Sequence, residues 1–128
     1  MLRLTLSIGI GLAAMTSCFA GTVNFTQQVF IEGTPMINPI KCPPDKDGKS
    51  SCEVPITLGE LCYYSLEREI PSQTWETAIK RDELAKAIRN AKDFVLLDDQ
   101  SKLIEEAMGP IWPPQVLGEV NKMINTKP

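Results

Sequence analysis

The spacing of apolar residues predicts four amphipathic helices in the second half of the chain. Apolar positions recur there every three or four residues, which places them on one face of a helix. The first helix begins at a capping box formed by Thr57 and Glu60 and ends before Pro71. The second runs from Ser72 or Thr74 to Asn90. The faces expected to be buried are Leu58, Leu61, Cys62, Ser65 and Leu66; Trp75, Ala78, Ile79, Ala85 and Ile88; Leu103, Ile104, Ala107 and Met108; and Val116, Leu117, Val120, Met123 and Ile124.

The last two helices have their own start and stop signals. Asp98 is expected to cap the third helix, which closes at Gly109, and the fourth starts at Pro113 and Pro114 because proline is tolerated in a first turn. Residues 94–97 are predicted to be an apolar connector between helices. Since short helices cannot bury their faces singly, we expect a mainly α fold. It is a small bundle of four short helices, preceded by an extended, proline-rich segment with one or two short strands.

The N-terminal part has a different pattern. Residues 23–31 carry the β-branched and aromatic content of a strand, which ends at the turn signals Gly33 and Pro35. Five prolines between positions 35 and 55 exclude a helix there. The predicted organisation is a signal peptide over 1–20, an extended segment over 21–56 and a helical domain over 57–128, with the helical part as the folding unit.

Residues 1–20 have the order of a secretory leader. Arg3 precedes an apolar run from Leu4 to Met15, which is too short to span a bilayer, and small residues follow. Two processing routes stay open: cleavage before Gly21, or a lipobox-like cleavage that leaves a lipidated Cys18. A third interpretation is that the true chain begins further downstream, so that these residues are not part of the protein. The expected location is periplasmic or secreted, with lipid anchoring to a membrane if Cys18 is modified and a cytoplasmic location if the start is mis-assigned.

Composition excludes some partners. The chain has 13 Lys and Arg against 16 Asp and Glu, a net charge of −3, and no basic block. Nucleic acids and anionic membrane surfaces need clustered basic residues, so neither is an expected partner.

The chain has four cysteines, but only three remain once the leader is set aside. Cys42 and Cys52 flank a polar loop whose Pro and Gly residues turn the chain back, so we expect a disulfide between them in an oxidising compartment. Cys62 is expected to be a buried free thiol, and the absence of histidine leaves it no base to activate it as a nucleophile.

Other chemistry is sparse, and we expect no catalytic residues, no metal site and no cofactor. Asp45, Asp47, Gly48 and Glu53 resemble a calcium loop, but the EF-hand spacing fails at both ends and a solvated turn is favoured. The acidic pairs at 98–99 and 105–106 are interpreted as a helix cap and a solvent face. Trp112 lies in a rigid loop, where it either plugs the end of the bundle or anchors a protein partner.

The helical half resembles small helical proteins encoded by phages and prophages. The shared positions lie between 57 and 124: Leu58, Gly59, Leu61, Arg81, Leu84, Ala85, Ile88, Leu97, Ile104, Gly109, Pro114 and Gly118. The resemblance implies an accessory or assembly domain that works by contact, and it supplies no catalytic residue. Those proteins lack an export signal, unlike this chain.

These observations predict a small exported, non-catalytic structural or interaction protein, with an unidentified protein as its partner in the cell envelope. Two alternatives stay open. One is a secreted or periplasmic binding module or inhibitor that uses the loop between Cys42 and Cys52. The other is a cytoplasmic phage accessory protein whose start is mis-assigned. An enzyme would need a buried acidic pair in a cleft, which the sequence does not indicate.

Overall fold

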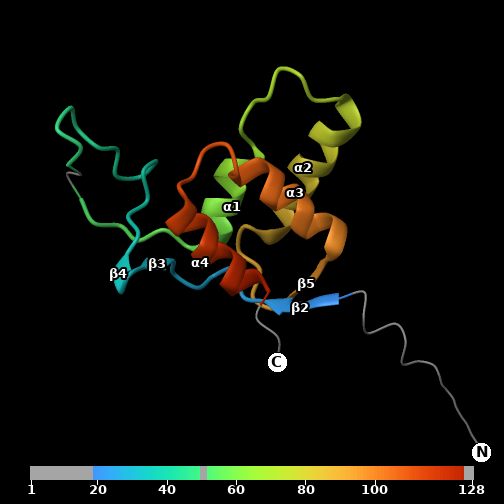
Figure 1. Cartoon of the computed structure of the whole chain (residues 1–128), viewed down its shortest axis with the longest axis horizontal. Coiled ribbons are helices and arrows are strands. Elements are labelled where there is room, and N and C mark those ends of the chain that lie inside the picture. Colours follow the sequence, from blue (N-terminus) through green and yellow to red (C-terminus); the bar gives the residue numbers. More distant parts are fainter. Residues whose placement is uncertain (1–18, 50–51, 126–128) are drawn as a thin grey trace, which may run out of the picture.

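Helices and two small sheets make up the part of the chain that the structure, a computed structural model, describes: residues 19–49 and 52–125 (Figure 1). The predicted lipidation site Cys18 and residues 1–18 of the expected leader lie outside the described residues. The elements are β2 (Phe19–Val23), β3 (Phe30–Ile31), β4 (Thr34–Pro35), α1 (Leu58–Leu66), α2 (Trp75–Ile88), β5 (Phe94–Leu97), α3 (Asp98–Met108) and α4 (Pro114–Ile124).

Helix α1 lies at the centre, with α2 and α3 packed against it. Its predicted capping box is present. The hydroxyl oxygen of Thr57 accepts from the backbone N–H of Glu60 at 3.1 Å, and the Glu60 carboxylate accepts from the N–H of Thr57 at 3.0 Å. Leu58, Leu61 and Cys62 are fully buried. The local signal therefore starts the helix, and its apolar face forms the middle of the core.

Helix α2 begins after Thr74, one of the two expected starts, and ends at Ile88, two residues before the expected Asn90, but the predicted buried face is wrong in part. Trp75 is 86% exposed and Ile79 54% exposed, whereas Arg81 is buried. The guanidinium of Arg81 donates to the carbonyl oxygens of Ser65 at 2.9 Å and Leu66 at 3.1 Å. The last carbonyls of a helix lack partners within it, so the Arg81 cation is stabilised at the C-terminus of α1. Helix α2 is therefore oriented with Arg81, rather than Trp75 and Ile79, toward α1.

The predicted connector at 94–97 is instead strand β5, which pairs antiparallel with β2. Thr22 lies opposite Val95, and Val23 lies opposite Phe94. The prediction of one strand over 23–31 is wrong: Val23 ends β2 and Phe30–Ile31 is β3 of the other sheet. Between them the Asn24 side chain accepts from the N–H of Thr26 at 3.0 Å and turns the chain. The fold thus has the four predicted helices but is a mixed α/β structure rather than a plain bundle.

The second sheet is a short hairpin of β3 and β4. Its two turn residues, Glu32 and Gly33, have φ of 52° and 83°, the left-handed conformation that matches the twist of a tight hairpin. The turn predicted at Gly33 is therefore present, although it joins two strands of two residues each.

The cap of α3 differs from the prediction. Leu97 occupies the N-cap position and Asp98 is the first helical residue. The side-chain oxygen of Gln100 accepts from the N–H of Leu97 at 2.9 Å. Because pairing with β2 holds Leu97 extended, the helix starts directly where the strand ends. Asp98 and Asp99 then lie in the first turn, where negative charge is favourable.

One apolar core joins the N-terminal segment to the helices. Phe25 and Val29 are fully buried. The N–H of Phe25 donates to Ala91 O at 2.8 Å, and its carbonyl accepts from the N–H of Gly59 at 2.7 Å. Residues 57–125 therefore do not pack as a unit separate from the preceding segment.

Candidate interaction site

A polar arm, defined as residues 38–54, projects from the helical body. Figure 1 shows it extending away from α1 on the side of β3 and β4. At its base the N–H of Asn38 donates to the carbonyl of Val54 at 2.7 Å, and Ile37 pairs with Pro55. The two ends of the arm are thereby held side by side.

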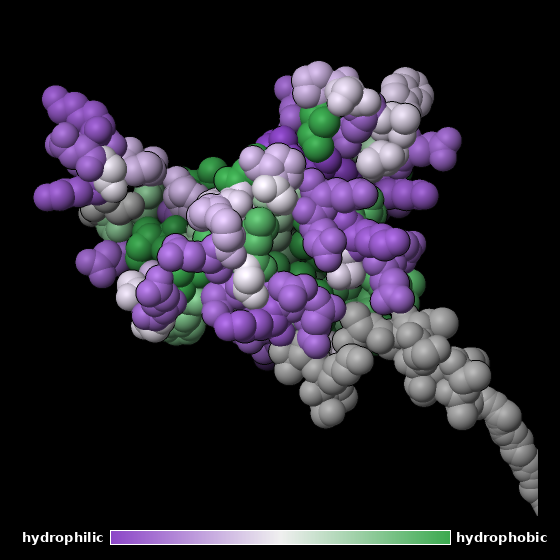
Figure 2. Space-filling view, viewed as in Figure 1, coloured by the Kyte–Doolittle hydropathy of each residue, from purple (hydrophilic) through white to green (hydrophobic). Residues whose placement is uncertain are grey.

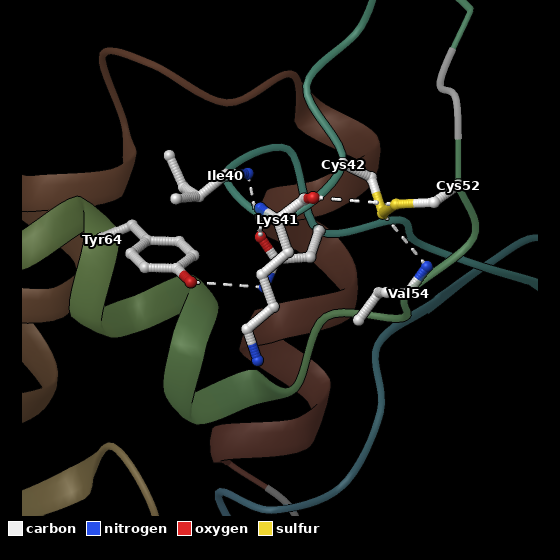
Figure 3. Close-up of a disulfide and its surroundings, with 7 residues drawn as sticks. Ile40, Lys41, Cys42, Cys52, Val54 and Tyr64 are labelled. Carbon is white, nitrogen blue, oxygen red and sulfur yellow. Dashed lines mark hydrogen bonds between the residues drawn. A yellow bond between two sulfur atoms is a disulfide. The ribbon is translucent and has the colours of Figure 1, made fainter.

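Asn38 organises the root of the arm. Its side chain is fully buried, and the amide oxygen accepts from the N–H groups of Ile40 at 2.9 Å and Lys41 at 3.0 Å. Its amide nitrogen donates to the phenol oxygen of Tyr64 on α1 at 3.3 Å. Figure 3 shows Tyr64 pointing from α1 toward this turn. A single buried amide therefore closes the turn and attaches it to the helical body.

Cys42 and Cys52 lie at disulfide distance, as the spacing of the loop predicts, with their Cα atoms 5.4 Å apart (Figure 3). Cys42 is fully buried, and the N–H of Val54 lies 3.3 Å from its sulfur. The bridge closes the arm above its hydrogen-bonded base. It limits the conformations available to the loop between the two cysteines in the folded and the unfolded chain.

An ion pair attaches the arm to the start of α1. Lys41 Nζ lies 3.1 Å from a carboxylate oxygen of Glu60, the residue that completes the capping box. Burial alone would raise the pKa of Glu60. The hydrogen bonds and charge supplied by Thr57 and Lys41 outweigh that effect, so the pKa lies below its ordinary value. The carboxylate thus serves the helix cap and the arm together.

The end of the arm is a closed turn. The Asp45 carboxylate accepts from the N–H groups of Asp47 and Lys49, each at 2.9 Å, and Gly48 has φ of 79°. This is the side-chain-closed turn that Asp favours, and glycine adopts the required left-handed conformation without strain. Three of the four residues considered for a calcium loop, Asp45, Asp47 and Gly48, therefore lie in a turn that the Asp45 carboxylate closes, and Glu53 lies outside it.

The arm offers two kinds of surface. Ile40 at its root is 64% exposed and Val54 is 38% exposed. The far end carries exposed Lys46, Asp47 and Lys49 and is hydrophilic in Figure 2. An apolar contact bordered by charged groups is the arrangement found at protein interfaces.

The other residues singled out by sequence have internal contacts. Trp112 is half-buried against the core, and its indole N–H donates to the Ser65 hydroxyl at 2.9 Å, as expected of a plug; its role as a partner contact stays a prediction. Cys62 is a buried free thiol, and burial raises its pKa to about 12. Glu105 and Glu106 lie exposed on α3.

Sequence reasoning missed Asn38, Tyr64 and Arg81. The Asn38-Pro39 pair is a turn signal that could have identified the first. Arg81 falls on the same helical stripe as Leu84, Ala85 and Ile88, so the spacing places it on the buried face once charge is disregarded. Tyr64 has no local signal, because its partner lies 26 residues away.

None of the helices in residues 19–49 and 52–125 has the length and apolar character needed to cross a membrane. Comparison with protein families, curated proteins and solved structures finds no match for this chain. The function is therefore argued from the site itself.

Proposed function

We propose that this chain is a small, non-catalytic interaction protein that acts outside the cytoplasm by binding another protein through its arm. The observation that carries the proposal is the way the arm is held. Its base is closed by backbone hydrogen bonds, its root by the buried Asn38 amide and its length by the Cys42–Cys52 pair.

Such an arm is suited to recognition. A loop that is already ordered loses less conformational entropy on binding than a free loop does, so more of the contact energy appears as affinity. Ile40 supplies exposed apolar area at the root, and the charged residues at the far end favour one orientation of the bound partner. The arm is thus held at its base and root, and it exposes Ile40 and the charged residues Lys46, Asp47 and Lys49.

The proposed compartment follows from two features. A disulfide persists in an oxidising environment, and the order of charge and apolar residues in 1–20 is that of an export leader. Cleavage before Gly21 would fall within β2 but would keep the paired residues Thr22 and Val23. The phage relationship of residues 57–124 stays a prediction.

The processing of the native protein tests the compartment. Intact mass should show a chain that starts at Gly21, or at a lipidated Cys18, and non-reducing peptide mapping should recover Cys42 and Cys52 in one linked peptide. A chain that retains Met1 and has both thiols free would contradict export and favour a cytoplasmic accessory protein.

Site-directed photo-crosslinking tests the arm. A photoreactive amino acid at position 40 or 46 should capture the same protein from envelope fractions, identified by mass spectrometry. The same group at Val95, which is 44% exposed on β5, should not capture it. The double variant C42S/C52S should weaken the crosslink from position 40 while the circular dichroism of the helices is retained. Equal capture from all three positions would contradict a specific role for the arm.

A further inference from the structure

The chain contains one three-residue pattern of the Asn-x-Thr type. Of its five asparagines, only Asn24 is followed two positions later by a hydroxyl residue, Thr26, and the residue between them, Phe25, is not proline. This pattern is the acceptor for N-linked sugars in exported proteins. Because the pattern also occurs by chance, the structure around Asn24 decides whether it can carry a sugar.

The Asn24 side chain is accessible, and its nitrogen is not used by the fold. Asn24 follows the last residue of β2 and lies exposed at the surface. Its amide oxygen is occupied, because it accepts from the N–H of Thr26 at 3.0 Å and from the Thr26 hydroxyl at 2.6 Å. Among the residues that the structure describes, none bonds to the amide nitrogen Nδ2. The turn therefore uses the oxygen and leaves available the atom to which a sugar is attached.

The surface beside Asn24 is the outer face of the β2–β5 sheet. Thr22 lies opposite Val95, so their side chains share a face. Exposure alternates along the chain, with Thr22 exposed, Val23 buried and Asn24 exposed, which places Asn24 on the same face as Thr22. On β5 Val95 and Leu97, two positions apart, are 44% and 41% exposed. Two exposed apolar side chains thus lie on the face from which a sugar on Asn24 would project.

We propose that Asn24 is a site of N-linked glycosylation and that the glycan covers the apolar outer face of the β2–β5 sheet. A glycan is bulky and hydrophilic, so it keeps such a face soluble. In the transfer, a bond forms between Asn24 Nδ2 and the anomeric carbon of a sugar, and the bond from that carbon to a phosphate oxygen of the donor breaks. The donor is a phosphate-activated sugar or oligosaccharide, and the proton lost by the amide goes to solvent. No atom changes its oxidation state, so the transfer needs no oxidant or reductant.

The proposal rests on export, which is part of the proposed function, but not on the arm. Cleavage before Gly21 and cleavage before Cys18 both keep Asn24 in the mature chain. Figure 1 shows β2 and β5 at the lower edge of the molecule, away from the arm. A glycan at this site therefore leaves Ile40 and the far end of the arm accessible to a partner.

Mass spectrometry of the protein from its native source tests the modification. The peptide that contains Asn24 should carry the mass of a sugar, and its fragmentation should place the sugar on Asn24. Three variants form a matched set. Asn24→Asp keeps an oxygen that accepts in the turn but loses the amide nitrogen, Thr26→Val keeps the size but loses the hydroxyl group, and Thr26→Ser keeps the hydroxyl group. We expect complete loss of the sugar in the first two variants and its retention in Thr26→Ser, with the circular dichroism of the helices unchanged in all three.

Binding of an apolar fluorescent dye tests the covering role. The unmodified variant Asn24→Asp should bind more dye than the glycosylated wild type, because the outer face of the sheet is then uncovered. Adding Val95→Thr to this variant should reverse most of the increase. A glycosylated wild type that binds as much dye as Asn24→Asp would contradict the covering role.

An unmodified Asn24 in the wild type would overturn the proposal, and the same sample shows whether export fails with it. If the leader is removed and Cys42 and Cys52 are linked, the chain is exported and only the glycosylation is wrong. If Met1 is retained and both thiols are free, export and glycosylation are both wrong. A sugar on Asn24 that persists in Thr26→Val would also contradict recognition of the three-residue pattern.

Discussion

Two glycines in helices should respond to the same substitution with opposite signs. Gly59 lies in the first turn of α1, where it meets the end of α2. An added Cβ would clash with the carbonyl oxygen of Arg89 and lie 2.8 Å from the carbonyl carbon of Arg89 and 2.9 Å from the oxygen of Ile88. All three neighbours are backbone atoms, which cannot rotate away as the end of a side chain can.

The size of the effect follows from two opposing contributions. Gly→Ala inside a helix normally stabilises by about 0.5–1 kcal/mol. Overpacking a tight contact costs about 1–3 kcal/mol, and more where the obstacle is rigid. The hydrogen bond of 2.7 Å from the N–H of Gly59 to Phe25 O prevents α1 from sliding away from the crowded site. We therefore expect Gly59→Ala to destabilise the fold by up to about 2.5 kcal/mol in net free energy of unfolding, which is the overpacking cost less the helix gain.

Gly118→Ala is the matched control, because its added methyl group meets nothing within 4 Å. It should stabilise by about 0.5–1 kcal/mol. Urea denaturation followed by circular dichroism measures both changes. Equal or greater stability of Gly59→Ala would refute the close approach of α1 and α2, and a loss of stability in Gly118→Ala would refute the open space beside α4.

Four further expectations follow from the structure. The pKa of Glu60 is lowered in the folded protein, so its ionised form stabilises the fold at pH values above the unfolded-state pKa. This contribution is lost as pH falls through the folded-state pKa. The difference in unfolding free energy between the wild type and Glu60→Gln should therefore shrink in acid. Ile88→Ala should cost about 2–5 kcal/mol because Ile88 is fully buried, whereas Ile79→Ala at an exposed site should change stability by less than about 0.5 kcal/mol, as measured by urea denaturation. Cys62, with its pKa of about 12, should resist iodoacetamide at pH 8 in the folded protein and react after unfolding, as followed by mass spectrometry; rapid labelling of the native protein would contradict its burial. A fragment over 55–125 should lose most of its helical circular dichroism, because it lacks the core residues of the N-terminal segment; a cooperatively folded fragment would restore the helical part as an independent unit.

The helix starts depend on interactions between residues close in sequence, and the sequence determined them. Thr57 and Glu60 are three residues apart, and their reciprocal hydrogen bonds need nothing from the rest of the molecule. Pro114 begins α4 because its φ suits a first turn. The approach of Cys42 and Cys52 is local in the same sense, since they are only ten positions apart and turn formers lie between them. The arm was accordingly predictable as a closed loop, whereas its attachment through Asn38 was not.

Tertiary structure decided which surfaces are buried. Trp75 and Ile79 have the spacing of a core face, yet α2 buries Arg81 because the carbonyl groups at the end of α1 need donors at that place. Residues 94–97 become a strand only because β2, more than 70 residues earlier, supplies hydrogen-bond partners. Periodicity specifies that a helix has an apolar face, but the groups that cover the face come from distant parts of the chain. The exposure of Trp75 and Ile79 on α2 and a groove between α3 and α4 result from that arrangement, which is why no local pattern predicted them.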